Sequence, residues 1–316
     1  MRGEGTGRAH AKVILLGEHA VVYGVPAIAT ALSQLTVTTC VTRLPAGEPG
    51  EITFTPAATM PPVAEETVTS LRNLVVQFKK VTGVDDRAAL ALRMDSMIPP
   101  GRGLGSSAAC ARSVVLALAD LFDVDLDAET VFDLVQYAET AAHGKSSGVD
   151  AFATGSDGLI GYVSGVAHEL ICGFDGVFVV ADSGASGRTK DAIEHVQRMF
   201  RADPAVETEF MQRVRDLTDA GVASLTEGHP SVFGAQLSAN HDVLRGIGLS
   251  TDHIEALVAA ACRAGALGAK ISGGGLGGCL VALAGDPDAA ATVAAALRAA
   301  GAVDTWFIPV GRFADV

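Results

Sequence analysis

The sequence is short of positive charge. Its 316 residues carry 23 lysine and arginine side chains against 36 aspartate and glutamate side chains, which gives a formal net charge of −13. A surface that binds nucleic acid or an anionic membrane needs an excess of positive charge, so we expect neither partner. Any anionic ligand must instead be held by a few local groups.

Paired cysteines and long hydrophobic runs are also missing. The five cysteines are scattered, and no two form a C-x-x-C pair, which predicts reduced thiols and no cysteine metal site. No segment approaches the roughly 20 apolar residues that span a bilayer. The apolar run at 13–16 is too short for a signal peptide, and Glu18 and His19 follow it. We therefore expect a cytoplasmic protein.

Glycine, by contrast, is plentiful and clustered. The segment 99–109 reads P-P-G-R-G-L-G-S-S-A-A and lies between an expected strand at 90–97 and an expected helix at 108–122. Glycines let backbone N–H groups approach a ligand, and the start of a helix offers unpaired N–H groups to an anion. Ser106 or Ser107 is the expected N-cap. The segment has neither the Gly-Lys-Ser/Thr ending of a P-loop nor the glycine spacing of a dinucleotide fingerprint, so it predicts another kind of phosphate loop.

Charged residues interrupt the apolar segment at 9–32. Lys12 precedes the apolar run at 13–16, which we interpret as a buried strand. A second apolar run at 20–23 is interpreted as another strand. Glu18 and His19 lie between the two runs. Each of these polar residues alone is typical of a solvated strand end, but three within eight positions favour the lining of a site, because burial without partners is costly.

Two carboxylates lie in and after the next expected helix, at 127–142. Glu139 lies near its end, and Asp150 closes the segment E-T-A-A-H-G-K-S-S-G-V-D. A glutamate four residues before a histidine is usually a surface contact. Phosphoryl transfer, however, needs a magnesium ligand, a base and a cation. Glu139, Asp150 and Lys12 supply these three types.

The last glycine cluster, K-I-S-G-G-G-L-G-G-C at 270–279, contains the pattern G-x-G-x-x-G. A dinucleotide fingerprint needs a strand before it and a helix after it. Here a helix precedes the cluster and a strand is expected at 279–283, so we reject a Rossmann site. The glycines predict a close backbone approach, either to a ligand or to the other glycine loop.

The C-terminal half adds mainly helices, at 190–201, 205–227, 232–247, 251–264 and 288–300, together with a last strand at 304–310. Helices and strands in this mixture predict an α+β fold. The length predicts about two domains.

Three segments in this order resemble the motifs of the GHMP small-molecule kinase superfamily. They are K-V-I-L-L-G-E-H-A-V-V-Y-G at 12–24, the phosphate loop at 99–109 and the third motif at 270–279. The G-E-H-A-V-V-Y-G segment resembles the mevalonate kinase family in particular. The family pattern is not followed at Lys145, Ser146, Ala151 and Leu276. These departures look like the bacterial type of the family.

The resemblance implies an activity and a fold. The activity is ATP-dependent phosphorylation of the 5-hydroxyl of mevalonate, giving 5-phosphomevalonate and ADP. The fold is the GHMP kinase fold, with a ribosomal-protein-S5-like N-terminal domain at 1–187, to which a last strand near 304–316 returns, and a ferredoxin-like C-terminal domain at 188–303. Phosphomevalonate kinase, another GHMP kinase and a non-catalytic metabolite-binding regulator stay open as alternatives.

The resemblance also assigns residues. Asp150 would accept the hydroxyl proton, Lys12 would stabilise the alkoxide, and Ser107 and Glu139 would bind Mg²⁺. The expected contacts to ATP are Pro99, Pro100, Gly101, Arg102, Gly103, Leu104, Gly105, Ser106, Ser107 and Ala108. The expected contacts to mevalonate are Glu18, His19, Asp150, Thr189 and Gly274. Whether the chain forms a homodimer stays open.

Overall fold

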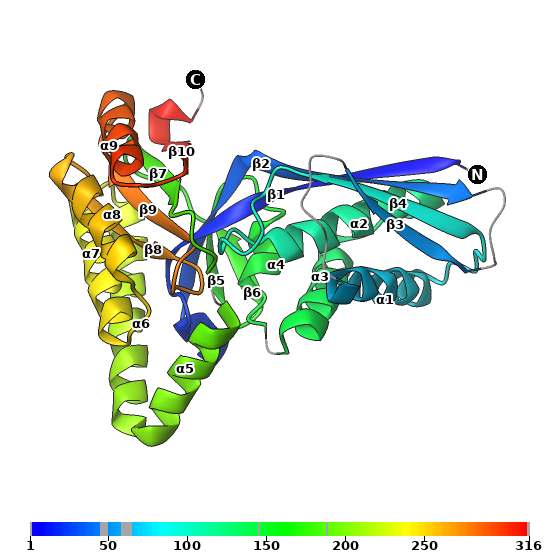
Figure 1. Cartoon of the computed structure of the whole chain (residues 1–316), viewed down its shortest axis with the longest axis horizontal. Helices are drawn as coiled ribbons and strands as arrows, with labels where there is room; N and C mark the ends of the chain where they lie inside the picture. Colours follow the sequence, from blue (N-terminus) through cyan, green and yellow to red (C-terminus); the bar gives the residue numbers. More distant parts are fainter. Residues whose placement is uncertain (1, 45–49, 58–64, 145, 188, 315–316) are drawn as a thin grey trace. The chain divides into compact units, whose positions relative to one another are not determined.

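The computed structural model describes residues 2–44, 50–57, 65–144, 146–187 and 189–314 (Figure 1). In chain order the elements are β1 (Glu4–Leu16), η1 (Ala20–Tyr23), β2 (Ala27–Leu44), β3 (Ile52–Pro56), α1 (Glu65–Thr82), β4 (Ala89–Ser96), α2 (Ser106–Phe122), α3 (Ala128–His143), α4 (Val149–Ala153), β5 (Leu159–Val163), β6 (Val166–Glu169), β7 (Gly176–Asp182), α5 (Thr189–Ala202), α6 (Pro204–Thr226), α7 (Pro230–Gly246), α8 (Asp252–Arg263), β8 (Gly268–Ser272), β9 (Cys279–Ala284), α9 (Pro287–Ala299), β10 (Asp304–Val310) and η2 (Gly311–Phe313). The expected α+β class is confirmed. Among the helices described, none is both long and apolar enough to cross a membrane.

The chain divides into two compact units. The first comprises Met1–Ala11, Ser33–Pro99 and Gly105–Gly155, and the second comprises Lys12–Leu32, Pro100–Leu104 and Ser156–Val316. This division does not coincide with the predicted domain boundary after residue 187. The reason lies in the second unit, where β7, which precedes that boundary, pairs with β9 and β10, which follow it.

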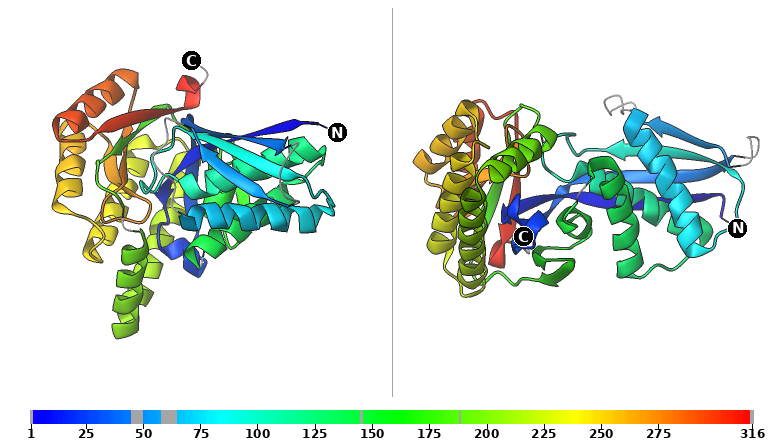
Figure 2. Two further views of the ribbon diagram at one scale, coloured as in Figure 1. Left: turned by 45° about the vertical axis from the view of Figure 1, so that its right-hand side comes forward. Right: turned by 90° about the horizontal axis from the view of Figure 1, so that it is seen from below.

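In the first unit, a sheet supports a layer of helices. Strand β4 runs antiparallel to residues 37–44 of β2 and parallel to β3, and α1, α2 and α3 lie together on one side of these strands (Figures 1 and 2). Leu74, Val75 and Phe78 of α1 are fully buried, as their helical spacing predicts. This core fixes the helices that carry the expected site residues.

Strand β1 packs directly against α2. At Gly5 and Gly7 of β1 the two backbones are in close contact. A Cβ atom at Gly7 would lie 2.2 Å from the carbonyl oxygen of Ser113, and one at Gly5 would lie 2.3 Å from the backbone nitrogen of Leu121. The hydroxyls of Ser113 and Thr39, the latter from β2, are 2.6 Å apart. These contacts set the position of α2, and therefore of its N-terminus, which directly follows the phosphate loop.

The second unit is built on an antiparallel sheet of order β10-β7-β9-β8. Every residue of β7 and β9 is buried, as expected for continuous apolar strands covered on both faces. Helices α8 and α9 pack on this sheet, and α7 packs against β8 (Figure 1). Residues 27–30 of β2 pair with β5 in the same unit, and β5 pairs with β6.

The apolar run at 20–23 is a 3-10 helix, η1, and the expected strand there is wrong. Gly17, His19 and Gly24 have φ angles of +102°, +61° and +81°, and the Val21 amide donates to Gly17 O at 3.0 Å. Left-handed residues on both sides turn the chain back on itself, which an extended strand cannot do. Ala20 packs in an apolar cluster with residues from α5 to α8.

Candidate functional site

The phosphate loop enters α2 through left-handed glycines. Gly101, Gly103 and Gly105 have φ angles of +68°, +76° and +71°. Gly105 is the N-cap, and α2 begins at Ser106, without a side-chain cap among the described residues. The expected N-cap at Ser106 or Ser107 is therefore wrong by one or two positions, because the left-handed glycine itself ends the loop. Ser106 and Ser107 instead occupy the first turn of the helix, where backbone N–H groups lack intrahelical partners.

Within the second unit, residues 100–104 of this loop dock onto β1 and the third glycine cluster. The Lys12 amide donates to Leu104 O at 3.0 Å, and its Nζ donates to Gly103 O at 3.1 Å. A Cβ atom at Gly103 would lie 3.1 Å from Ser272 O. The glycines of the third cluster were expected to approach either a ligand or the other glycine loop. The structure shows the close approach to the other loop.

In the first unit, α2 and α3 bring two expected magnesium ligands together. The Ser107 hydroxyl donates to Glu139 Oε1 at 2.5 Å. Ser107 is exposed, whereas Glu139 is buried. The Cys110 thiol, one turn further along α2, has its pKa raised to about 12 by burial and by the negative charge of Glu139. Two adjacent oxygen donors of this kind suit a hard cation.

Asp150 lies in the first turn of the short helix α4. Gly148, with a φ of +92°, precedes this helix, and a carboxylate in a first turn is stabilised by the helix dipole. Arg112 Nη2 donates to Ala151 O at 2.7 Å and so ties α4 to α2. Asp150 is partly exposed. It belongs to the first unit, with Ser107 and Glu139, whereas Lys12 belongs to the second.

Glu18 forms a buried ion pair that was not predicted from the sequence. Its Oε1 accepts a hydrogen bond from Nζ of Lys270, on β8, and Lys270 Nζ also donates to Ile271 O at 2.6 Å. The two side chains are 1% and 0% exposed. Burial raises the pKa of the Glu18 carboxyl, although the Lys270 charge and hydrogen bond act in the opposite direction. Glu18 Oε2 is also buried and has no hydrogen-bond partner among the described residues. The signal in the sequence was a lysine within an otherwise apolar strand, which requires a counter-charge.

His19 and Gly274, both expected at the mevalonate pocket, contact each other. His19 Nε2 lies 3.0 Å from Gly274 O and donates to it. Burial is the main cause that lowers the pKa of His19 to about 4. The imidazole is therefore neutral at pH 7. Thr189 is the first residue of α5, and its side chain lies outside the described part of the chain.

We expect His19 to make the stability of the protein depend on pH. An unfolded imidazole takes up its proton near pH 6.5, whereas the folded one does so near pH 4. Between these values the unfolded state binds more protons, so the free energy of unfolding falls as the pH is lowered through this window. Asparagine tolerates the left-handed backbone at this position. In His19→Asn the free energy of unfolding should therefore fall less than in the parent as the pH is lowered. Denaturant titrations at pH 4 to 7 test this, and parallel curves for parent and variant would contradict it.

Leu276, a departure from the family pattern, adopts a left-handed backbone with φ of +56°. Such a conformation costs a β-carbon-bearing residue roughly 1–2 kcal/mol. Its amide donates to Leu249 O at 2.8 Å, and its side chain packs against the apolar cluster of α5 to α8. That packing offsets the backbone strain of a leucine at a position where the family frequently has glycine.

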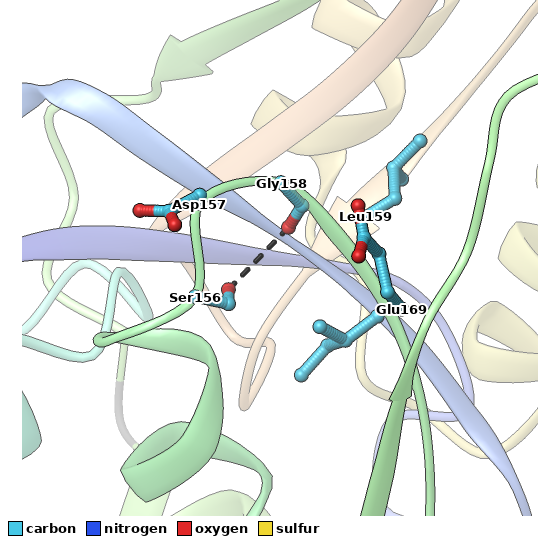
Figure 3. A pocket seen from close by; sticks show the side chains of 6 residues that line it. Ser156, Asp157, Gly158, Leu159 and Glu169 are labelled. Carbon is cyan, nitrogen blue, oxygen red and sulfur yellow. Dashed lines mark hydrogen bonds between the residues drawn. The ribbon is translucent and has the colours of Figure 1, made fainter.

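A separate pocket of about 210 Å³ lies around β5 and β6 (Figure 3). It is lined by Ser156, Asp157, Gly158, Leu159, Ile160 and Glu169. None of these residues is an expected site residue. The carboxylates of Asp157 and Glu169 disfavour a phosphorylated ligand there, so we do not assign this pocket to the nucleotide.

Comparisons with known proteins identify the family to which this chain is similar. The model of the GHMP kinases N-terminal domain matches residues 69–158, and that of the GHMP kinases C-terminal domain matches residues 222–303. Mevalonate kinases of Pyrococcus abyssi and Thermococcus sibiricus are 31% and 33% identical to this chain, over 93% of it and 92% of each relative. The structure of L. major mevalonate kinase in complex with R-mevalonate superposes with a TM-score of 0.84 at 26% identity, covering 98% of this chain and 97% of that one. This chain belongs to the mevalonate kinase family of the GHMP kinases.

Proposed function

We propose that the protein transfers the γ-phosphoryl group of ATP to the 5-hydroxyl of mevalonate, giving 5-phosphomevalonate and ADP. The observation that carries the proposal is the similarity to mevalonate kinases over almost the whole chain. Lys12, Ser107, Glu139 and Asp150 supply the side-chain types that this chemistry requires. A non-catalytic regulator on the same fold has no need to retain these four side chains.

Asp150 and Lys12 would act on the acceptor hydroxyl. The hydroxyl proton passes to the Asp150 carboxylate as the oxygen attacks the γ-phosphorus, and the bond between that phosphorus and the β–γ bridging oxygen breaks to release ADP. The Lys12 ammonium, whose Nζ donates to Gly103 O in the phosphate loop, would offset the negative charge that develops on the attacking oxygen. Backbone N–H groups of the loop and of the first turn of α2 would bind the phosphates.

The Ser107 and Glu139 oxygens fit a magnesium ion. Mg²⁺ in proteins is usually bound by one or two carboxylates together with substrate phosphates, and the adjacent hydroxyl and carboxylate oxygens match that need. When bound, the ion supplies positive charge that neutralises the triphosphate.

Replacing Ser107 with alanine should raise the magnesium concentration needed for half-maximal activity. The substitution removes one proposed ligand but leaves the Glu139 carboxylate. The measurement is the rate of ADP release over a range of free Mg²⁺. Ser156→Ala, which removes a hydroxyl that donates to Gly158 O at 3.4 Å and that has no proposed role in metal binding, serves as the control. Identical magnesium curves for Ser107→Ala and the parent would remove Ser107 from the metal site.

The acceptor is tested by comparing ADP release with mevalonate, phosphomevalonate, homoserine and galactose side by side. We expect kcat/KM to be highest with mevalonate. A preference for phosphomevalonate would instead support a phosphomevalonate kinase. A preference for homoserine or galactose would support another member of the GHMP kinase superfamily. ATP binding without ADP release for any acceptor would support the regulator.

A further inference from the structure

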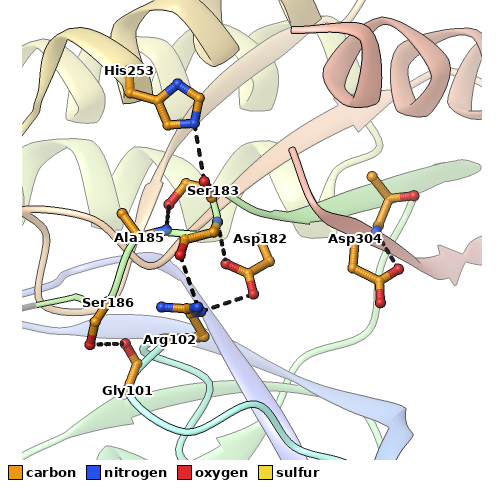
Figure 4. A network of polar contacts seen from close by, with 10 residues as sticks. Gly101, Arg102, Asp182, Ser183, Ala185, Ser186, His253 and Asp304 are labelled. Carbon is orange, nitrogen blue, oxygen red and sulfur yellow. Dashed lines mark hydrogen bonds and ion pairs between the residues drawn. The ribbon is translucent and has the colours of Figure 1, made fainter. Parts of the chain in front are cut away.

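The side chain of Arg102, in the middle of the phosphate loop, is engaged by a neighbouring turn. Its Nε donates to Asp182 Oδ2 at 2.9 Å, and its Nη2 donates to Gly184 O at 3.0 Å (Figure 4). The side chains of Arg102 and Asp182 are 19% and 5% exposed. Two donors of the guanidinium are therefore directed at residues of the chain itself.

The turn at 182–187 is bonded to both glycine clusters. Towards the phosphate loop, the Gly187 amide donates to Gly101 O at 2.8 Å. Towards the third glycine cluster, the Ser183 amide donates to Gly278 O at 3.0 Å, and the Gly278 amide donates to Ala185 O at 2.9 Å. The turn thus forms a bridge between the two clusters within the second unit.

Asp182 holds this bridge together from the end of β7. Its Oδ1 accepts from the Gly184 amide at 2.8 Å, while its Oδ2 accepts from Arg102. His253, on α8, donates from Nε2 to Ser183 O at 3.1 Å and fixes the turn from another side (Figure 4). A buried carboxylate without a cation is strongly unfavourable, so Asp182 depends on the Arg102 guanidinium.

We propose that Arg102 is a positioning residue for the nucleotide. Its guanidinium neutralises Asp182 and fixes the backbone of residues 101–103 to the bridge, so that the loop presents its N–H groups to the phosphates in a fixed conformation. The Cys279 amide, which donates to Arg102 O at 3.2 Å, holds the same backbone from the third cluster. The inference rests on the proposed function in one respect, that the nucleotide is ATP.

A direct phosphate contact by Arg102 is the competing role, and the two roles predict opposite effects of Asp182→Asn. If Arg102 positions the loop, loss of the Asp182 charge releases the loop and weakens ATP binding. If Arg102 binds phosphate, the same change frees the guanidinium for the nucleotide, and ATP binding stays equal or tightens. Arg102→Gln weakens ATP binding in both cases, so it does not discriminate alone.

The experiment measures ATP affinity, without any acceptor, for Arg102→Gln, Asp182→Asn, the double variant and the conservative Arg102→Lys. We expect the Kd for ATP to rise about tenfold in each of the first two, since a hydrogen bond to a charged group is lost. The double variant should bind ATP no more weakly than the single variant with the lower affinity, because both substitutions break the same contact. Arg102→Lys should recover part of the affinity. In kinetics the KM for ATP should rise while kcat changes little.

Backbone amide exchange gives a readout that needs neither nucleotide nor acceptor. Peptides that cover 185–187 and 277–280 should exchange faster in Arg102→Gln and Asp182→Asn than in the parent. Asp86→Asn is the control, because Asp86 pairs with Arg43 at 2.9 Å in the first unit. The two arginines are similarly exposed, at 18% and 19%, although Asp86 is more exposed than Asp182, at 19% against 5%. Asp86→Asn should leave these peptides and the ATP affinity unchanged.

Two results would overturn the proposal. One is unchanged or tighter ATP binding in Asp182→Asn together with weaker binding in Arg102→Gln, and the other is parental exchange at both peptides in all variants. A parent enzyme that fails to phosphorylate mevalonate would reject the proposed function without affecting the exchange or the ATP titration, so the two failures are distinguishable.

Discussion

Replacing Asp150 with asparagine is expected to lower turnover by about 10²- to 10⁴-fold, the usual contribution of a general base. Asparagine keeps the size of the side chain but cannot accept the hydroxyl proton. The proposed phosphate contacts are made by other groups, so the Kd for ATP should stay within about twofold of the parent. Initial rates of ADP release at saturating mevalonate and ATP, with a separate ATP titration, measure both effects.

Asp157→Asn is a suitable control for this prediction. Asp157 is an exposed aspartate in the loop before β5, and the same charge is removed there without a proposed role in the chemistry. Its turnover should equal that of the parent. If Asp150→Asn also retained full turnover, Asp150 would not be the base. If it lost ATP binding as well as turnover, the residue would instead be needed for the structure of the nucleotide site.

Replacing Lys270 with methionine is expected to destabilise the protein by about 3–5 kcal/mol, the usual cost of removing one partner of a buried ion pair. The Glu18 carboxylate would then be buried with one oxygen already unpartnered and the other deprived of its donor. Methionine fills a similar volume, so the loss of charge, and not a cavity, dominates the effect. The measurement is the free energy of unfolding by denaturant at pH 7.

A second substitution isolates the electrostatic cause. Adding Glu18→Gln to Lys270→Met removes the orphaned charge and should restore more than half of the lost free energy. Arg213→Met breaks the exposed pair with Glu209, whose side chains are 57% and 71% exposed, and should change stability by less than about 1 kcal/mol. Parental stability of Lys270→Met would show that the buried pair is not required for folding.

Periodicity predicted most of the elements but not those that depend on single backbone angles. The helices from α5 to α9 and the strand β9 were predicted correctly, because burial of one face or of both faces leaves a repeating pattern. The four apolar residues 20–23 carry no such repeat. Whether they form a strand or a 3-10 helix was decided by the positive φ angles of Gly17 and His19, and the histidine gives no signal of that conformation.

The candidate site shows a similar division. Residue types and spacing indicated Lys12, Glu139 and Asp150, because phosphoryl transfer restricts the chemistry. The partners of buried charges could not be predicted in this way. Glu18 and Lys270 are separated by 252 positions, and Arg102 and Asp182 by 80. The sequence shows that a buried charge needs a partner, but only the pairing of β7, β8 and β9 brings the partner to it.

The docking of residues 100–104 on the turn at 182–187 and on the third glycine cluster has a consequence for synthesis on the ribosome. Both docking partners follow the phosphate loop in the chain, so the loop leaves the exit tunnel without them. At about 5–20 residues per second, the third cluster is translated on the order of ten seconds later. Nucleotide therefore cannot assist the folding of the nascent N-terminal residues by binding to a completed loop. Any stabilisation by ATP begins only after almost the whole chain has emerged.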